Sequence, residues 1–204
     1  MRILVTGNLG YIGSVMTEKL EDYGHDVVGL DIGYFNDCLT SEYKKPNKQI
    51  LKDLKYIEEK DIEDIDAVIH LASLSNDPLG AFMPELTNKI NYEATIRLAN
   101  ISKKNKIKKF VFASTQSIYG ISKTDKELDE DNSIKDPITA YAITKWKAEQ
   151  EIMLMADNDF CVTALRPSTV FGPSPRFRAD IVYNNLLACA YTLKKIEIWS
   201  DGTP

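Results

Sequence analysis

The amino-acid sequence predicts an α/β fold, in which a parallel sheet is doubly wound by helices on both of its faces. Short apolar runs alternate along the chain with longer amphipathic stretches, a pattern typical of βαβ units. The short runs are apolar throughout rather than alternating, as expected for strands that are covered on both faces. Of the 204 residues, 44% are hydrophobic and 27% are charged, which is the composition of a globular chain with a core.

The first half of the chain contains three apolar runs of strand length, namely Arg2–Thr6, Asp26–Asp31 and Ala67–Leu71. Between the first two, the segment Tyr11–Tyr23 predicts a helix. Its apolar residues recur at helical spacing and define one face: Ile12, Val15, Met16 and Leu20. The segment Ile32–Asn47 is polar and aromatic, and we expect it to be a loop.

Two long amphipathic stretches farther along the chain, Asn88–Asn105 and Ala140–Met155, predict helices. Each is followed by an apolar run that predicts a strand, Lys109–Ala113 and Cys161–Arg166 respectively. The order of these elements therefore extends the alternation of strands and helices across the chain.

Beyond Arg166 the chain becomes rich in proline and glycine, which indicates a domain boundary. We therefore divide the chain into a domain over 1–166 and a second region over 167–204. In the second region we expect a helix over Asp180–Leu193 and a short strand over Ile196–Trp199.

Charge and composition exclude several classes of protein. The net charge of −5, from 25 Lys and Arg against 30 Asp and Glu, argues against a nucleic-acid partner. No apolar run approaches the roughly 18 residues of a membrane-spanning helix, and the N-terminus lacks a signal peptide. The three cysteines and two histidines have no metal-site spacing. We expect a cytoplasmic protein with no metal and no membrane partner.

Two clusters of like charge have ordinary structural explanations. The acidic segment Lys123–Pro137 is a solvated loop on the preferred interpretation, with metal binding as the alternative. Positive charges gather at the C-terminal end of the helix expected over Asn88–Asn105, where they complement the helix dipole; nucleic-acid binding is the weaker alternative. These charges are Lys103, Lys104, Lys106, Lys108 and Lys109.

A glycine-rich turn between the first strand and the first helix predicts a dinucleotide site. Gly7, Gly10 and Gly13 are spaced three apart, and the helix N-terminus offers free N–H groups to a pyrophosphate. Asp31 ends the second strand, where a carboxylate binds ribose hydroxyls and repels a 2′-phosphate. Neither Ile32 nor Gly33 supplies a cation beside it, so NAD is favoured over NADP.

A second constellation indicates proton transfer. Tyr141 and Lys145 are four residues apart and share one face of the expected helix. The ammonium favours the ionised phenol, whose free pKa of about 10 is too high for a base at neutral pH. An ordinary surface pair is the alternative. The segment Phe112–Gly120 places small hydroxyl residues at the carboxyl end of a strand, where doubly wound sheets bind ligands.

Together these residues resemble the extended short-chain dehydrogenase/reductase family. Within it they resemble the nucleotide-sugar epimerase and dehydratase branch, of the UDP-glucose 4-epimerase type. The resemblance rests on motifs in Thr6–Gly13, Asp31, Asp53–Leu54, His70–Ser73, Asn91, Ala113–Gly120, Tyr141–Lys145 and Leu165–Pro173. It implies that 1–166 is an NAD-binding Rossmann domain and that 167–204 begins a substrate-binding domain. It also implies a homodimer that pairs the two long helices.

The resemblance also assigns roles to individual residues. Thr115 matches the catalytic Ser/Thr, Tyr141 the general base and Lys145 its partner. The residues that it places at NAD are Gly7, Asn8, Leu9, Gly10, Tyr11, Ile12, Gly13, Asp31, Ile32, Asp53, Leu54, Leu71, Ala72, Ser73, Asn91, Ala113, Ser114, Tyr141, Lys145, Arg166 and Pro167.

Departures from the family pattern narrow the expected chemistry. Gln116 and Ser117 stand where 4,6-dehydratases carry an Asp-Glu pair, and decarboxylating relatives keep a glutamate at the second of these positions. Neither His25 nor His70 is placed by motif for a 3,5-epimerase. We therefore expect epimerisation of a nucleotide-diphosphate sugar by transient oxidation at C4, with Tyr141 as base. The alternatives are a reductase, dehydrogenase or dehydratase of the same family, and a non-catalytic NAD-binding protein.

The substrate side is less strongly marked in the sequence. Thr115, Gln116 and Ser117 would lie beside the sugar, and Thr169 stands where relatives often have asparagine. Three further residues have a structural alternative: Asn76 in a plain turn, and Arg176 and Arg178 as surface arginines rather than a diphosphate clamp. Family members continue past this sequence, so the resemblance implies a fragment with an incomplete substrate-binding region.

Overall fold

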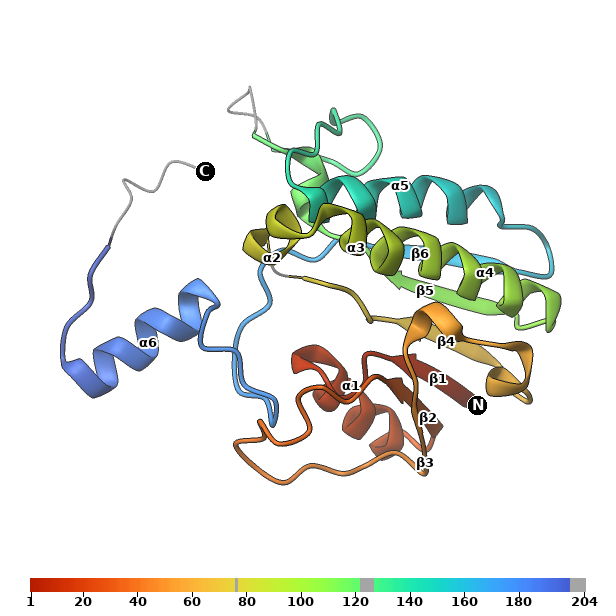
Figure 1. Cartoon of the computed structure of the whole chain (residues 1–204), viewed down its shortest axis with the longest axis horizontal. Coiled ribbons are helices and arrows are strands. Elements are labelled where there is room, and N and C mark those ends of the chain that lie inside the picture. Colours follow the sequence, from red (N-terminus) through yellow and green to blue (C-terminus); the bar gives the residue numbers. More distant parts are fainter. Residues whose placement is uncertain (76, 122–126, 199–204) are drawn as a thin grey trace.

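A six-stranded parallel sheet forms the centre of the computed structural model, which describes residues 1–75, 77–121 and 127–198 (Figure 1). The strand order β3-β2-β1-β4-β5-β6 is that of a doubly wound sheet, as the sequence predicts. The strands are β1 (Arg2–Thr6), β2 (Asp26–Asp31), β3 (Lys48–Leu51), β4 (Ala67–His70), β5 (Lys109–Ala113) and β6 (Cys161–Leu165). The order of strands reverses between β1 and β4, and ligands bind at this point of such sheets.

Helices cover the two faces of the sheet unequally. The helix α1 (Tyr11–Asp22) lies on one side, and α4 (Ala94–Lys104) and α5 (Ala140–Leu154) lie together on the other (Figure 1). The large buried cluster lies on the α4 and α5 side and includes Leu4, Leu98, Phe110 and Ile152. A smaller cluster on the α1 side comprises Ile3, Val5, Val27 and Ala67. Most of the apolar core therefore lies beneath the helix that carries Tyr141 and Lys145.

The structure corrects the expected face of the first helix. The buried residues of α1 are the small ones, Gly13, Ser14 and Thr17, whereas Ile12 is 36% exposed. Small side chains let the helix approach the sheet closely at its N-terminus, and larger apolar residues then lie at the flanks of the contact. Leu20 still packs against the smaller cluster.

The helix expected over Asn88–Asn105 is divided. The short α2 (Asp77–Phe82) and α3 (Pro84–Asn88) precede a π-helical turn over Lys89–Glu93, and only then does α4 begin. Such turns often mark functional sites. Short 3₁₀ turns occupy Leu54–Tyr56, Glu59–Ile62 and Gln116–Tyr119.

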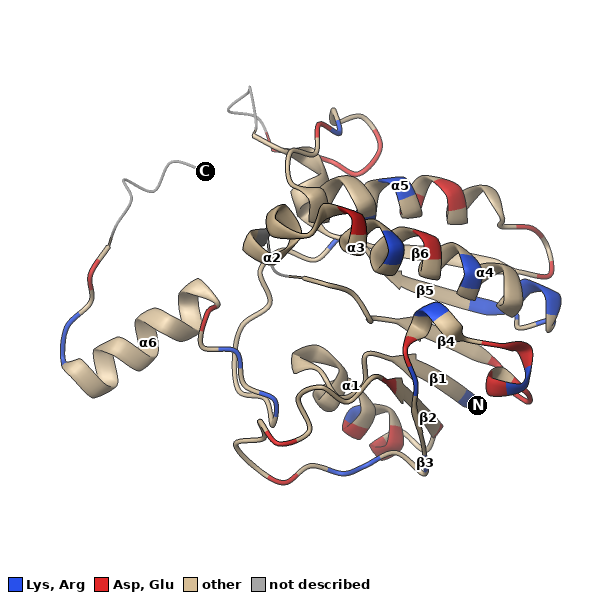
Figure 2. Cartoon of the chain, in the orientation of Figure 1, with Lys and Arg blue, Asp and Glu red and all other residues tan. Residues whose placement is uncertain are grey.

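The C-terminal region forms an arm that leaves the sheet. Its helix α6 (Val182–Leu193) begins two residues later than expected, and the predicted strand over Ile196–Trp199 is absent from the described residues 196–198. Figure 2 shows that α6 carries no Lys, Arg, Asp or Glu. We call the described residues 167–198 the arm below.

Candidate active site

The glycine-rich turn has the geometry of a phosphate-binding cradle. Gly7 has φ of +73°, and a Cβ there would lie 2.7 Å from the Ala72 backbone nitrogen. A Cβ at Gly13 would lie 2.0 Å from the Gly7 carbonyl oxygen. Both positions therefore require glycine, and α1 begins immediately after Gly10 with its first N–H groups available to an anion.

Asp31 lies beside this turn, at the end of β2. Its two carboxylate oxygens accept hydrogen bonds from the backbone N–H of Gly33 at 2.9 Å and of Leu9 at 3.2 Å. The carboxylate is thus held at the edge of the cradle, where the sequence predicts the ribose hydroxyls. The adjacent Ile32 is exposed.

Asn8 belongs to the same turn, but its side chain lies beneath it. The amide is fully buried, exchanges hydrogen bonds with Gln49 at 2.7 and 3.2 Å, and lies over Gly29. A Cβ at Gly29 would lie 2.3 Å from this amide. The predicted cofactor contact of Asn8 is therefore left to its main chain.

The loop after β4, Leu71–Ser75, forms the opposite side of the cradle and is held by Asn91. The Asn91 amide, in the π-helical turn, accepts from the Leu74 N–H at 2.8 Å and donates to the Leu74 carbonyl at 3.0 Å. Asn91 is fully buried. The interruption of the predicted helix thus allows an amide to fix the loop that contains Leu71, Ala72 and Ser73.

A directed chain of hydrogen bonds passes through the buried His70. The Thr95 hydroxyl donates to the Asn91 carbonyl, so it accepts from His70 Nε2, 2.8 Å away. His70 Nδ1 is then an acceptor for the Thr6 hydroxyl at 2.6 Å, and this hydroxyl in turn accepts from the Ala72 N–H. Burial, together with the Lys145 charge, lowers the pKa of His70 to about 3. His70 is therefore a neutral residue that supports the cradle.

Lys145 and Tyr141 lie on one face of α5, as their spacing predicts. Lys145 is 2% exposed, and its ammonium donates to the Ala113 carbonyl at 2.7 Å. Its nitrogen lies 6.0 Å from the centre of the Tyr141 ring and 4.7 Å from that of Phe112. Burial lowers the pKa of Lys145 to about 7.

Thr115 follows β5 and begins the turn Gln116–Tyr119. Its hydroxyl accepts from the Ser117 N–H at 3.2 Å and donates to the Ser117 hydroxyl at 3.2 Å. Thr115 is 7% exposed, whereas Gln116 and Ser117 are exposed. The chain therefore brings a hydroxyl, a phenol and an ammonium to the carboxyl end of β5, beside the predicted cofactor residues Ala113 and Ser114.

Three other predicted cofactor residues have side chains that are occupied elsewhere. Leu54 lies in the core, and Asp53 caps the 3₁₀ turn after it by accepting from the Lys55 N–H at 2.9 Å. The Arg166 guanidinium binds Glu149, Tyr119 and the Glu130 carbonyl, and the Glu149 contact raises its pKa above the ordinary range. For Arg166, as for Asn8, the predicted cofactor contact is left to the main chain.

Pro167 stays near the site through its carbonyl, which accepts from the Gln116 N–H at 3.1 Å. Thr169 is exposed in the arm. The two arginines separate: the Arg176 guanidinium stacks 4.4 Å above the Phe35 ring, whereas that of Arg178 pairs with Asp180 and donates to the Ser75 hydroxyl at 3.4 Å. Asn76 lies outside the described residues.

Comparison with known proteins identifies the family to which the chain belongs. The profile of the NAD dependent epimerase/dehydratase family matches residues 3–204. The chain belongs to this family. The resemblance inferred from the sequence is therefore confirmed, and the family's cofactor is NAD.

Relatives of this family include an uncharacterized UDP-glucose epimerase of Bacillus subtilis, which is 30% identical over 99% of this chain and 66% of the relative. The UDP-glucose 4-epimerase of the same organism is also 30% identical, over 92% of this chain and 59% of the relative. MoeE5 in complex with UDP-glucose and NAD is 29% identical with a TM-score of 0.83, over 100% of this chain and 65% of that one. The chain thus spans about two thirds of the length of these proteins.

The residues present fit NAD on geometric grounds. The turn at Gly7 and Gly13 has no room for a Cβ, and the Asp31 carboxylate lies at its edge with no cation supplied by Ile32 or Gly33. These are the residues of this family member that would hold the pyrophosphate and the ribose. Within residues 1–75, 77–121 and 127–198, no cluster of three or more His, Cys, Asp or Glu is placed to bind a metal ion.

A group of hydrogen bonds that no sequence motif indicates joins the arm to the cradle. Ser174 donates to the Tyr11 carbonyl at 2.7 Å, and the Tyr11 hydroxyl donates to the Gly172 carbonyl at 2.7 Å. Asn184 of α6 binds the same tyrosine. The partners are more than 150 residues apart, so no local pattern signals the contact.

None of the helices in the described part of the chain has the length and apolar character of a membrane span.

Proposed function

We propose that this chain carries the cofactor site and catalytic residues of a nucleotide-sugar epimerase that oxidises its substrate transiently, at C4, with Tyr141 as general base. The observation that carries the proposal is the buried Lys145 ammonium, held on the Ala113 carbonyl at 2.7 Å and 6.0 Å from the Tyr141 ring. A surface tyrosine–lysine pair would have neither the burial nor the fixed partner. The family, whose relatives include UDP-sugar epimerases, supports the substrate class.

The chemistry follows from the three side chains at the end of β5. The Lys145 cation favours the phenolate of Tyr141, which takes the proton from a sugar hydroxyl. Thr115 hydrogen-bonds the same oxygen and holds it toward the phenolate. NAD, held by the turn at Gly7 and Gly13 and by Asp31, would supply the hydride acceptor for the sugar carbon and, once the keto-sugar has rotated, the hydride donor at its opposite face. Tyr141 then returns its proton to the sugar oxygen.

Burial gives Lys145 a second property. Because desolvation lowers its pKa to about 7, the ammonium loses a proton far more easily than an ordinary lysine. Its bond to the Ala113 carbonyl keeps the group near the Tyr141 ring.

The exposed Gln116 and Ser117 favour epimerisation over dehydration. Neither side chain can act as an acid or base at neutral pH, and both lie directly beside Thr115.

We further propose that residues 1–166 bind NAD and that 167–204 lie on the substrate side, with Thr169, Arg176 and Arg178 toward the diphosphate. The proposal extends to a cytoplasmic homodimer that pairs α4 and α5; the free thiols of Cys38, Cys161 and Cys189 suit a reducing compartment.

The test is a panel of UDP-, dTDP-, GDP- and CDP-sugars incubated with the protein and NAD, with the products read by NMR. An inverted sugar carbon without net NADH is the expected result. Stoichiometric NADH would identify a net oxidoreductase, loss of water a dehydratase, and tight NAD binding without turnover a non-catalytic binder. Tyr141→Phe should abolish turnover and keep NAD affinity, whereas Tyr23→Phe, at an exposed tyrosine after α1, should change neither.

A further inference from the structure

Asn184 is the buried residue of α6, at 4% exposure in a helix whose other residues are partly or fully exposed. Its amide makes three hydrogen bonds. The oxygen accepts from the Gly172 N–H at 3.0 Å, and the nitrogen donates to the Tyr11 hydroxyl at 3.1 Å and to the Arg178 carbonyl at 3.0 Å. One side chain thus joins the helix of the arm, both ends of the segment 172–178 and the start of α1.

The bonds among these partners close a ring. The Tyr11 hydroxyl, which accepts from Asn184, donates in turn to the Gly172 carbonyl at 2.7 Å. Gly172 has φ of +120°, a conformation that few side chains tolerate, and both its N–H and its carbonyl are bound within the ring. Because Tyr11 belongs to the glycine-rich turn, the arm is fixed directly on the dinucleotide site.

The residue that this ring places is Arg178. With its carbonyl held by Asn184, the Arg178 guanidinium reaches the Ser75 hydroxyl of the loop after β4 at 3.4 Å. Its pKa is raised mainly by the hydrogen bond to Asp180, and also by the nearby phenols of Tyr141 and Tyr11. The guanidinium therefore contacts the loop that follows β4, within electrostatic range of the Tyr141 and Tyr11 phenols.

We propose that Asn184 is a positioning residue, which holds Arg178 at the loop after β4 so that the guanidinium can bind the anionic part of the substrate. The inference rests on the proposed function for the identity of that anion, a nucleoside diphosphate. Asp180 occupies the Nε and Nη2 groups of Arg178, so the Nη1 side, which faces Ser75, is the side that would bind such oxygens. Asn184 holds the Arg178 main chain from outside the site, without touching the ligand.

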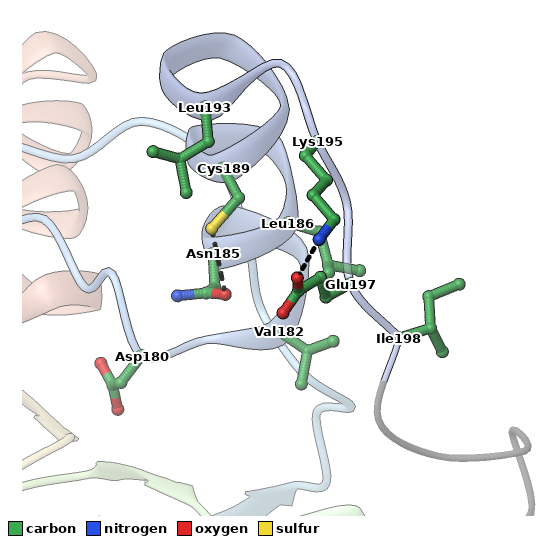
Figure 3. A pocket seen from close by; sticks show the side chains of 9 residues that line it. All are labelled: Asp180, Val182, Asn185, Leu186, Cys189, Leu193, Lys195, Glu197 and Ile198. Carbon is green, nitrogen blue, oxygen red and sulfur yellow. Dashed lines mark hydrogen bonds and ion pairs between the residues drawn. The ribbon is translucent and has the colours of Figure 1, made fainter.

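The neighbouring Asn185 is a matched control. It lies on the side of α6 that lines a hollow of about 500 Å³, together with Val182, Leu186 and Cys189 (Figure 3). Its side chain accepts a weak hydrogen bond from the Cys189 thiol at 3.8 Å, within α6 itself. Making the same substitution at Asn184 and at Asn185 therefore distinguishes loss of the hydrogen-bonded ring from a general effect of a substitution in α6.

The experiment measures the affinities of UDP and NAD by calorimetry for Asn184→Leu, Asn185→Leu, Arg178→Met and the double variant Asn184→Leu/Arg178→Met. We expect Asn184→Leu to weaken UDP about tenfold and NAD less than threefold, and Asn185→Leu to change neither. If Asn184 acts through Arg178, the double variant binds UDP no more weakly than Arg178→Met. Asn184→Asp, which keeps the acceptor and loses both donors, replaces Asn184→Leu if the latter does not fold.

Several outcomes would overturn the proposal in distinguishable ways. Equal losses of UDP and NAD affinity, or additive losses in the double variant, would show a structural role alone. Wild-type UDP affinity in Asn184→Leu, with a loss in Arg178→Met, would refute the positioning role and leave the proposed function standing. Unchanged UDP affinity in Arg178→Met would remove the diphosphate as the ligand of this guanidinium.

Discussion

Strand β1 and helix α6 differ in how deeply their apolar residues are buried. Four of the five residues of β1 are buried between the two faces of the sheet. In α6, by contrast, the buried residue is the polar Asn184, whereas Val182, Leu187 and Tyr191 are 69%, 62% and 77% exposed. The sheet domain is thus held by an apolar core, and the arm is attached to it by hydrogen bonds at Tyr11, Ser14 and Thr40. Apolar sequence alone does not determine which segments are tightly held.

The largest expected difference is between two aromatic residues. Phe110 is fully buried, with its ring centre 6.1 Å from that of His70 and 5.9 Å from that of Phe160. Phe110→Ala should lower the free energy of unfolding by about 3–5 kcal/mol, because it removes a core side chain and leaves a cavity. Tyr183→Ala in the arm, where the residue is 54% exposed and stacks on Phe171, should cost less than about 1 kcal/mol in urea denaturation. Similar losses for both variants would contradict the comparison.

The buried histidine of the sheet domain predicts a pH dependence. In the unfolded chain His70 binds a proton below its ordinary pKa of 6.5, whereas the folded chain resists protonation down to about pH 3. The unfolded state therefore binds more protons in this window, and the free energy of unfolding should fall by about 2 kcal/mol from pH 7 to pH 5.

Chemical denaturation at a series of pH values measures this fall. In His70→Gln the part of the slope that belongs to this residue should disappear, although the variant is less stable at pH 7 because hydrogen bonds to Thr6 and Thr95 are altered. His25→Gln, at the partly exposed histidine before β2, is the matched control. An unchanged slope in His70→Gln would show that His70 takes up its proton over the same pH range in the folded and the unfolded protein.

A smaller effect is expected where the arm meets the cradle. Ser174 is 8% exposed, and its hydroxyl donates to the Tyr11 carbonyl and accepts from the Arg176 N–H at 3.2 Å. Ser174→Ala should weaken this attachment by about 1 kcal/mol without unfolding the sheet. Hydrogen exchange should accelerate at the Arg176 amide and stay unchanged in β1. Equal acceleration in both would mean that the arm and the sheet open as one unit.

The elements that the sequence predicts well are those with a local signal. β1, β2 and β5 have the expected bounds, because a strand covered on both faces is apolar along its whole length. The strand β3 was missed, since this edge strand (Lys48–Leu51) pairs with β2 alone and has mostly exposed residues. The sequence does not predict the π-helical turn at Asn91, because the residue that Asn91 binds there, Leu74, lies outside the helix.

The residues of the candidate site likewise fall into those that a local sequence signal predicts and those that it does not. The spacing of Gly7 and Gly13, and that of Tyr141 and Lys145, follows from local geometry that a sequence records directly. The positions of Arg166 and Asn184 depend on partners that are distant in the chain, Glu149 and Tyr11 among them. No periodic pattern marks such partners, so the sequence could suggest a polar role for these residues but not which atoms they bind.

The smallest expected effect tests whether the apolar face of α6 contributes to folding of this chain. Leu187 is 62% exposed, so its replacement by a polar residue of similar length removes little buried area. Leu187→Gln should therefore change the free energy of unfolding by no more than about 0.5 kcal/mol in the denaturation used for Phe110→Ala. A loss of 2 kcal/mol or more, on the order of a buried leucine, would show that α6 packs its apolar face against the sheet domain in solution. The arm would then be held as the core is, and the contrast between β1 and α6 would be lost.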